Sequence, residues 1–364
     1  MSEKFGYSYY VVKKGQLRPS IMLFQLASSK LAEVLSKPEW VLSPDGDAGP
    51  KTDKVIRAIQ THYGYNPPDG SVGKATWGSM TADLGDWRPP LRLRLAELQN
   101  TFENGNVANC FGACNVVSFE GWPNFGVWNV NSPGGSASGT SLGALLSMAG
   151  RTDLYSAVSS KDNDSIAYFM RSKEGKEVQL NAYMDKYIIA PAIDWLNKSG
   201  FNLDFEASQL PNALDPFHER LLALSVDIAV NSGPAGYAPK RVPRRWDGAG
   251  TFAWDDGLPD QGACRAIFSE VFEVKLPLDP AEDFSYSVNT RDTYVQALKR
   301  CLWEVCTTDE QRINLIADLQ GRCIQPRNDL AAMVIQRRRA VARKDGYRFQ
   351  GSDYCLWRHF GIGI

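Results

Sequence analysis

The sequence has few of the residues on which metal sites and nucleophilic enzymes depend. It holds three histidines and seven cysteines, and no two cysteines form a Cys-x-x-Cys pair. Structural zinc sites use such pairs or clustered histidines, so we expect no metal ion and no other cofactor. Three scattered histidines also give no Ser-His-Asp or Cys-His catalytic order. The cysteines are too sparse for a disulfide scaffold, and their odd number leaves at least one thiol unpaired.

A long apolar run is missing as well. No stretch reaches the roughly 18 to 20 apolar residues that cross a bilayer, so we expect no membrane insertion. The first eight residues lack the basic, apolar and small-residue regions of a secretory signal. We therefore expect synthesis in the cytoplasm without a signal peptide, so that action outside the cytoplasm needs release or delivery by another system.

Neither sign of charge is in excess. The chain has 40 basic and 41 acidic residues, a formal net charge of -1. This balance excludes a polycation that coats nucleic acid or anionic membrane by bulk charge. The run at residues 336–344, with Arg337, Arg338, Arg339, Arg343 and Lys344, is a local basic cluster. Such runs on helices are usually solvated faces, so we expect that here and no nucleic-acid partner. The ten tryptophans suit both a core and a sugar-binding surface.

Two segments near the N-terminus repeat one turn pattern. Residues 45–52 and 69–76 both begin Asp-Gly-x-x-Gly and end in threonine. In each, we expect the first glycine to take a positive φ and the aspartate side chain to bond the following backbone. We expect the threonine to cap the next helix.

Helical periodicity predicts a small bundle around these turns. Between them, Val55, Ile56 and Ile59 share one face of a helix over residues 52–63, which Gly64 ends. A second amphipathic helix upstream is indicated by Leu23, Leu26, Leu31 and Leu35. With a helix after the second turn, the prediction is a minimal three-helix bundle.

This pattern resembles the bacterial peptidoglycan-binding domain, over roughly residues 16 to 82 and including the pair Thr76-Trp77. The resemblance implies bacterial peptidoglycan as the partner, with cell-wall glycopeptide held in a shallow groove between helices. It offers Gln60, Tyr63 and Trp77 as candidate binding residues.

The length predicts more than one domain, at roughly 100 to 200 residues each. Residues 84–91 are rich in glycine and proline, which is typical of a short stiff connector. We therefore predict a peptidoglycan-binding domain at residues 1–83, a linker at 84–92 and a second domain at 93–364.

The second domain begins with a segment that suits acid catalysis. The pattern LRLRLAELQNTFEN over residues 91–104 predicts a helix with Leu91, Leu95 and Leu98 on one face. Glu103 then falls at its C-terminal end. There a carboxyl group faces the negative pole of the helix dipole, which favours the neutral form that a general acid needs.

A second acidic residue follows on a predicted hairpin. Residues 115–131 predict two short strands with glycine and proline at the tip, where Glu120 lies. Two carboxyl groups that face each other are what hydrolysis of a sugar chain requires. One protonates the departing oxygen, and the other activates water or stabilises positive charge.

The succession TFEN, FEGWPNFGVWN and SASGTSLGALL resembles the lysozyme-like superfamily, in particular family 46 glycoside hydrolases (chitosanases) and their peptidoglycan-cleaving relatives. The resemblance implies a mainly α fold in which an α-rich lysozyme-like domain carries a small β-hairpin beside a cleft. It implies Glu103 as the general acid and Glu120 as the base. The sequence departs from that branch because Glu120 replaces an aspartate, and because Asn124 or Phe125 stands where a hydroxyl residue holds the water.

The candidate substrate-binding residues of this region are Trp122, Asn124, Trp128 and Asn231. The two tryptophans flank Glu120 and suit stacking on sugar rings. Asn231 ends an apolar helix, where it could bond an N-acetyl group or cap the helix. Asp227 in that helix is predicted to form a structural ion pair with a clustered arginine, since a lone buried carboxylate is costly.

These features together predict a cell-wall hydrolase, a lysozyme-like muramidase that cuts the β-1,4 glycan by acid/base catalysis. Inversion is expected if the carboxyl groups stand about 6.5 to 9.5 Å apart. The alternatives are a chitosanase, a lytic transglycosylase that uses one glutamate, and a non-enzymatic wall-binding protein. We expect action in the periplasm or on the cell wall, after phage lysis or delivery by a secretion system. Delivery would add an immunity protein as a partner.

Overall fold

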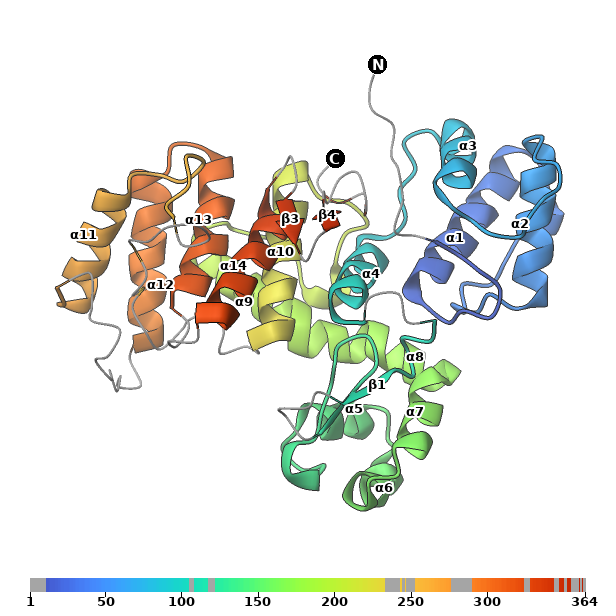
Figure 1. The fold of residues 1–364 in the computed structure, drawn as a ribbon, viewed down its shortest axis with the longest axis horizontal. Helices are drawn as coiled ribbons and strands as arrows, with labels where there is room; N and C mark the ends of the chain where they lie inside the picture. Colours follow the sequence, from blue (N-terminus) through green and yellow to red (C-terminus); the bar gives the residue numbers. More distant parts are fainter. Residues whose placement is uncertain are drawn as a thin grey trace. The chain divides into compact units, whose positions relative to one another are not determined.

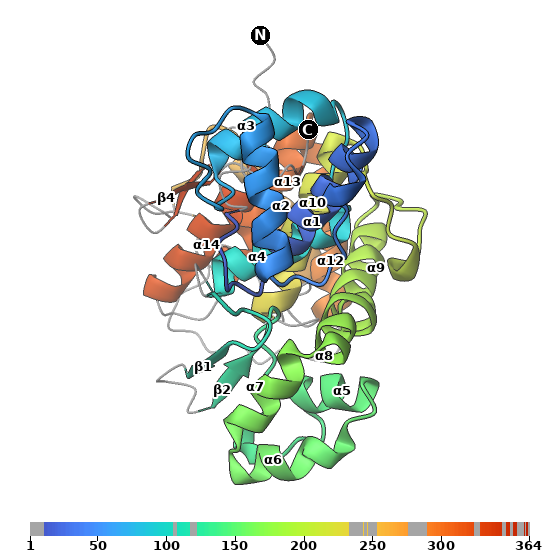
Figure 2. The same ribbon diagram turned by 90° about the vertical axis from the view of Figure 1, so that its right-hand side faces the viewer.

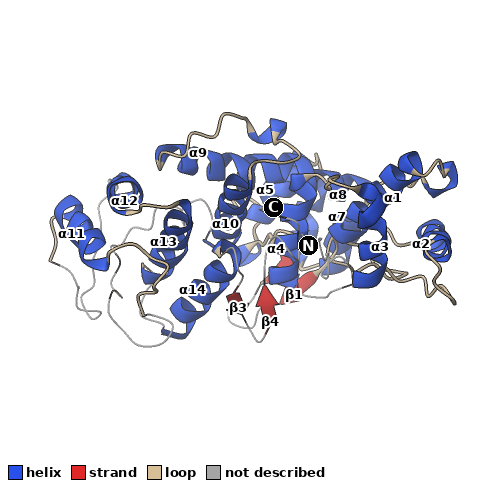
Figure 3. Cartoon of the chain, turned by 90° about the horizontal axis from the view of Figure 1, so that it is seen from above, coloured by secondary structure: helices blue, strands red, loops and turns tan. Residues whose placement is uncertain are grey.

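The computed structural model describes residues 11–104, 108–116, 122–232, 243, 246, 253–275, 290–323, 328–343, 347–349, 352–354, 360 and 362. These residues are mainly helical, as the colours of Figure 3 show, which confirms the predicted mainly α class. Within the described ranges no helix is both long and apolar enough to cross a membrane.

The helices follow one another along the chain as labelled in Figure 1. Their bounds are α1 Pro19–Val34, α2 Pro50–His62, α3 Lys74–Leu84, α4 Leu91–Asn104, α5 Ser141–Met148, α6 Tyr155–Ser160, α7 Asn163–Arg171, α8 Lys173–Val178, α9 Ala190–Lys198, α10 Pro216–Ser232, α11 Gln261–Phe272, α12 Thr290–Arg300, α13 Asp309–Arg322 and α14 Asn328–Ala342. Short 3-10 turns lie at Pro38–Trp40, Pro133–Gly135, Thr152–Leu154 and Ala207–Gln209, and π-helical segments at Gln179–Ile189 and Cys301–Val305. The strands pair antiparallel as β1 Cys114–Val116 with β2 Pro123–Phe125, and β3 Tyr347–Phe349 with β4 Ser352–Tyr354.

The chain divides into two compact units. Unit 1 consists of Met1–Tyr187, Ala207–Ala213 and Trp357–Ile362, and unit 2 of Ile188–Glu206, Leu214–Leu356 and Gly363–Ile364. The predicted linker at residues 84–92 lies inside unit 1. The division into domains at residues 1–83 and 93–364 stays a prediction.

The predicted three-helix bundle is present in unit 1 as α1, α2 and α3 (Figure 2). The apolar face predicted for α2, namely Val55, Ile56 and Ile59, is buried. Burying one such side chain stabilises a fold by about 1.5 to 3 kcal/mol. The helix ends at His62, and Gly64 follows with a φ of 80°, as its position in the sequence predicted.

The bundle continues into α4, whose bounds agree with the helix predicted over residues 91–104. At the start of α1, a buried Arg18 guanidinium lies 2.7 Å from the buried Glu97 carboxylate of α4. The backbone N–H of Ser20 donates to the same carboxylate at 3.0 Å. The backbone of Leu17 also bonds both Ala108 and Cys110. The bundle and α4 therefore share one interior.

The predicted hairpin is confirmed by the pairing of β1 with β2, which lies beside α7 (Figure 2). Pro123 is paired with Val116 rather than placed at the tip, so that detail of the prediction is wrong. Proline is tolerated as the first residue of a strand, where its missing N–H costs least. The segment 117–121 between the strands, which includes Glu120, lies outside the described residues.

The core of unit 2 contains arginine side chains. Arg337, Arg338 and Arg339 of α14 are only 9%, 1% and 3% exposed, so the prediction of a solvated arginine face is wrong. The reason is that acidic partners lie opposite the run on α10 and α13. As predicted, Asp227 forms an ion pair with an arginine of the cluster, at 2.6 Å from Arg337.

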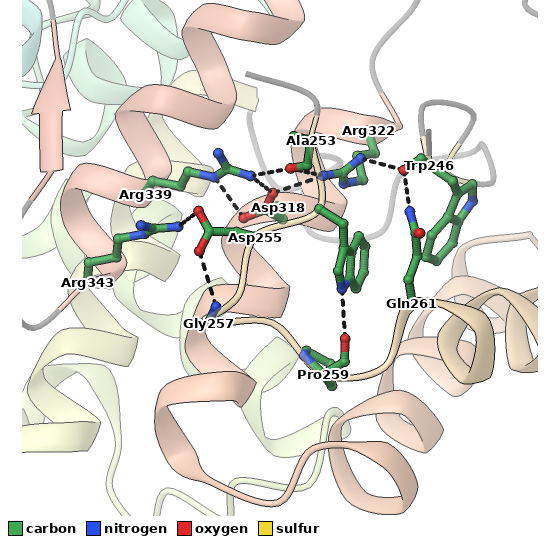
Figure 4. A network of polar contacts seen from close by, with 11 residues as sticks. Trp246, Ala253, Asp255, Gly257, Pro259, Gln261, Asp318, Arg322, Arg339 and Arg343 are labelled. Carbon is green, nitrogen blue, oxygen red and sulfur yellow. Dashed lines mark hydrogen bonds and ion pairs between the residues drawn. The ribbon is translucent and has the colours of Figure 1, made fainter. Parts of the chain in front are cut away.

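A second acid organises the neighbouring network in unit 2, shown in Figure 4. The carboxylate of Asp318 on α13 accepts from Arg339 at 3.0 Å and from Arg322 at 3.2 Å. The Arg322 guanidinium lies 5.0 Å from the ring centre of Trp254, a cation–π arrangement. Arg322 of α13 and Arg339 of α14 thus share one buried carboxylate.

Candidate functional site

The second Asp-Gly turn is held by one glutamine. The side-chain amide of Gln60, on α2, donates to Asp69 Oδ1 at 2.6 Å and to the Ser71 carbonyl at 2.8 Å. Its oxygen accepts from the backbone N–H of Gly70 at 2.9 Å. Gln60 is 1% exposed. The contacts make it the interior clamp of the turn, a structural role, and leave little of it for a ligand.

The first turn has the same connections around a different glutamine. Gln25, on α1, donates to Asp45 Oδ1 at 2.7 Å and to the Asp47 carbonyl at 3.1 Å, and accepts from the Gly46 N–H at 2.9 Å. Sequence analysis identified both turns but missed Gln25. The sequence signal that could have identified Gln25 is a glutamine on the helix that precedes each turn.

The predicted chemistry of the turns is confirmed in part. Gly46 and Gly70 both have a φ of 74°, and each aspartate side chain accepts from the backbone N–H two residues later. The prediction that the threonines cap the next helix is wrong. Thr52 lies one turn inside α2, behind the N-cap Gly49, and its hydroxyl donates to the Asp47 carbonyl at 2.9 Å. The hydroxyl closes the turn instead of the helix end.

The other two candidates of the bundle have different environments. The hydroxyl of Tyr63 donates to Asp83 Oδ2 at 2.7 Å, and burial together with this carboxylate raises the pKa of Tyr63. Its ring is half-buried, so part of it faces solvent. Trp77 is fully buried and meets Phe24 edge to face, with ring centres 6.0 Å apart. Trp77 therefore belongs to the core of the bundle.

Glu103 is held in place by two side-chain amides. It is the penultimate residue of α4, as predicted, and is half-buried. Gln99, one turn earlier, donates to Oε1 at 2.9 Å, and Asn129 donates to Oε2 at 2.6 Å. Both carboxyl oxygens thus have a fixed donor, which restricts the rotamer of the group.

Asn129 reaches Glu103 from a tight turn after β2. Phe125 and Val130 exchange two backbone hydrogen bonds of 2.8 and 3.0 Å, which closes a loop over residues 126–129. Asn129 has a φ of 49°, a left-handed conformation that asparagine tolerates better than most residues. The turn therefore aims the amide at the end of α4.

Both amides leave an acceptor open beside the carboxyl group. Oε1 of Gln99 and Oδ1 of Asn129 are buried and have no hydrogen-bond partner within the described residues. Unsatisfied buried acceptors are uncommon and mark places where a ligand or water can bind. Gln99 has no exposed surface, so an internal water, rather than a sugar, is the partner that so buried an acceptor admits.

A chain of asparagines joins the end of α4 to the hairpin. Asn115 of β1 donates to Asn104 Oδ1 at 2.7 Å, and Asn104 donates to the Gly126 carbonyl at 3.3 Å. Asn104 also donates to Asn100 Oδ1 at 3.2 Å. These bonds fix the hairpin against the helix end that carries Glu103.

The predicted aromatic candidates do not lie in equivalent places. Trp128 is 4% exposed, and its indole N–H donates to the Gln179 carbonyl at 2.7 Å, so its ring lies in the core. Trp122 is half-buried, with the Lys161 ammonium 5.0 Å from its ring centre. Asn124, in β2 opposite Asn115, is also buried. Of the two tryptophans, Trp122 has the more accessible ring.

The remaining candidates cannot be placed against Glu103. Glu120 lies outside the described residues, and the side chain of Asn231, at the end of α10, does too. The separation of the two predicted catalytic carboxyl groups is therefore not measured, and their pairing stays a prediction. Among the described residues no group of three or more His, Cys, Asp or Glu side chains is placed to hold a metal ion.

Comparison with known families identifies the bundle. The family described as "Putative peptidoglycan binding domain" matches residues 29–80, which include both Asp-Gly turns, α2 and most of α3. Searches of curated proteins and of solved structures gave no match. The N-terminal part is thus a peptidoglycan-binding domain at residues 29–80, and the comparisons identify no catalytic domain.

Proposed function

We propose that this protein cleaves the β-1,4 glycan strand of bacterial peptidoglycan, with Glu103 as the proton donor. The observation that carries the proposal is the fixed position of Glu103, between the amides of Gln99 and Asn129 at the end of α4. A positioned general acid contributes about a hundredfold to ten-thousandfold to a rate.

The peptidoglycan-binding domain supports the choice of substrate. It matches residues 29–80, and α1 shares a buried ion pair with the helix that carries Glu103. Binding of the wall by this domain would raise the local concentration of glycan at Glu103, as for any two sites linked in one chain. The proposed place of action is the periplasm or the cell wall.

Glu120 is the proposed second carboxyl group. In the sequence it falls between β1 and β2, the hairpin that the asparagine chain fixes to the end of α4. In the proposed reaction Glu103 protonates the departing glycosidic oxygen while Glu120 activates the attacking water. The product would then be inverted at the anomeric carbon, and NMR of the anomers immediately after cleavage tests this.

Digestion of purified sacculi tests the whole proposal. Wild type, Glu103→Gln, Glu120→Gln and the control Glu174→Gln, an exposed residue of α8, would be compared by turbidity and by mass of the products. Glutamine keeps the shape of Glu103 but cannot donate the proton, so we expect at least about a hundredfold loss. The control should match wild type. Unchanged activity of Glu103→Gln would remove Glu103 from the mechanism.

The masses also separate the alternatives. Reducing ends that have gained water indicate hydrolysis, whereas 1,6-anhydro ends with an active Glu120→Gln variant indicate a lytic transglycosylase that uses one acid. Faster release from soluble chitosan than from sacculi indicates a chitosanase. Binding of sacculi without any released fragment indicates a non-enzymatic wall-binding protein.

A further inference from the structure

A cavity in unit 1 lies outside the Glu103 site. Its volume is about 640 Å³, within the range of small-molecule sites, roughly 300 to 1,000 Å³. Glu103 is not among the residues that line it. Three stretches supply most of its wall, namely 43–45 before and in the first Asp-Gly turn, 90–93 at the start of α4, and 173–181 along α8 and the residues after it.

One side of this cavity carries charges of both signs. Lys173 and Glu177 of α8 are 3.8 Å apart, and their side chains are 89% and 61% exposed. An ion pair this exposed contributes less than about 1 kcal/mol, so both charged groups are available to a ligand. Lys176 instead donates to the Asp45 carbonyl at 2.5 Å, which ties α8 to the first turn.

Another part of the wall is apolar. Leu93 and Leu180 are buried, and Met22 of α1 is half-buried. Arg92 also lines the cavity, but its guanidinium bonds the Leu180 and Ala207 carbonyls and pairs with Asp185. Arg92 therefore serves as wall, and Lys173 and Glu177 are the groups that can meet a ligand.

We propose that this cavity binds the stem peptide of peptidoglycan through an amino acid that carries both a free amine and a free carboxylate. The proposal rests on the proposed peptidoglycan substrate and adds a peptide subsite to it. Lys173 would pair with the carboxylate and Glu177 with the amine, while Met22 and the two leucines cover the alkyl chain that joins these two groups to the peptide. A ligand whose amine and carboxylate lie next to each other at the end of an alkyl chain matches this wall, in which Lys173 and Glu177 are 3.8 Å apart, and an uncharged sugar does not.

Calorimetry with the intact protein tests the subsite. The probe is the purified disaccharide–tetrapeptide of sacculi, compared with the same disaccharide without peptide and with the tetrapeptide compound acetylated on its amine. Each probe ends in N-acetylmuramic acid and so lacks the bond between this sugar and a following N-acetylglucosamine, which is the bond that a muramidase cuts. We expect the peptide-bearing probe to bind at least about tenfold more tightly than either of the other two.

Variants of the charged pair assign the contacts. Lys173→Glu should weaken binding of the peptide-bearing probe by at least about tenfold, whereas Lys198→Glu, an exposed lysine of α9, should not. In Glu177→Gln, acetylation of the probe should no longer change its affinity. Thermal melts of each variant confirm that the fold is kept.

Two results would overturn the subsite: equal affinity for probes with and without peptide, or unchanged binding by Lys173→Glu. The readout is separate from that of the proposed catalysis. Loss of glycan cleavage by Glu103→Gln is measured on sacculi, so the subsite can fail while the hydrolase stands, and the hydrolase can fail while the peptide still binds.

Discussion

Asn129 shows how the backbone conformation of one residue sets the geometry of a candidate catalytic group. Its φ of 49° and the closed loop over residues 126–129 direct its amide to Oε2 of Glu103. Gln99 makes the matching bond from within α4. Because the two donors come from different elements, the carboxyl group is held on both sides, and either donor can be removed by itself.

Replacing Asn129 with glycine tests this positioning role. Glycine accepts the left-handed backbone without strain but removes the donor to Glu103. Glu103 becomes charged as it donates its proton, and a hydrogen bond to a charged group contributes about 1.5 to 3 kcal/mol, so we expect kcat on sacculi to fall by about tenfold to a hundredfold with KM little changed. A shift of the pH–rate profile should accompany the loss. Equal loss in Asn129→Gly and Asn129→Ala with no such shift would indicate a folding defect instead.

Gln60 predicts a pH dependence of the second turn. Its amide, followed by the Ser71 N–H, lowers the pKa of Asp69 below its ordinary value. A lowered folded-state pKa stabilises the fold above the unfolded-state pKa, and this contribution is lost as the pH falls through the folded-state value. In Gln60→Leu we expect the Asp69 pKa to return toward its ordinary value, as measured by carbon NMR of the carboxyl group. An unchanged titration would show that Gln60 does not control Asp69.

At the scale of elements, α4 joins the wall-binding bundle to the candidate catalytic residue. Its N-terminal half carries Glu97, which pairs with Arg18 of the bundle, and its C-terminal end carries Glu103. The asparagine chain then fixes the hairpin to the same end. One helix therefore contacts the peptidoglycan-binding bundle and carries the proposed acid.

The Arg18–Glu97 pair should contribute strongly to unit 1. Glu97→Gln removes the carboxylate that pairs with the buried Arg18 guanidinium, and removal of one partner of a buried pair costs about 3 to 5 kcal/mol. Glu33→Gln is the matched control because Lys30 and Glu33 form an exposed pair on α1, worth less than about 1 kcal/mol. Urea unfolding, monitored by hydrogen exchange of the amides of α1 and α4, measures the loss of stability in both variants.

A double variant separates charge from packing at this position. Arg18→Met with Glu97→Leu removes both charges, and replacement of a buried pair by apolar side chains is often neutral. We expect it to recover most of the stability that Glu97→Gln loses. Failure to recover would mean that the hydrogen bond from Ser20, rather than the ion pair, holds α1 to α4.

Several elements could be predicted from the sequence because their signals are local. The bounds of α4 follow from its leucine spacing and from the prolines that precede it, and the Asp-Gly turns follow from glycine and aspartate chemistry. Gln25 was missed because it precedes Asp45 by 20 residues, whereas Gln60 precedes Asp69 by 9. The extra chain, which includes the 3-10 turn Pro38–Trp40, hides the repeat.

Other features depend on partners that are distant in sequence. The sequence predicts a solvated face for the arginine run of α14, because Asp227 lies 110 residues before Arg337 and no local pattern connects the two. The Gln99 contact to Glu103 has helical i,i+4 spacing and could have been anticipated. The Asn129 contact spans 26 residues and requires the turn geometry.

At the scale of the whole molecule, the two units should respond to mutation separately. Asp318→Asn removes the carboxylate that two arginines share in unit 2, whereas Glu97→Gln acts in unit 1. Each variant should lower hydrogen-exchange protection mainly within its own unit, because proteins open locally in contiguous cooperative segments. Mass spectrometry of exchanged peptides from α4 and α13 reads the two units. Equal loss of protection in both units from either variant would show one cooperative whole.

The burial of Arg18 also matters to anyone who grafts the wall-binding module onto another enzyme. A fragment cut at residue 83 would retain the guanidinium but lose its carboxylate, together with the helix that covers that flank of α1. Such a fusion would separate Arg18 from Glu97 and expose the apolar surface of α1 that α4 covers, so we expect it to aggregate. A fragment that extends through Asn104, or one in which an apolar residue replaces Arg18, should aggregate less.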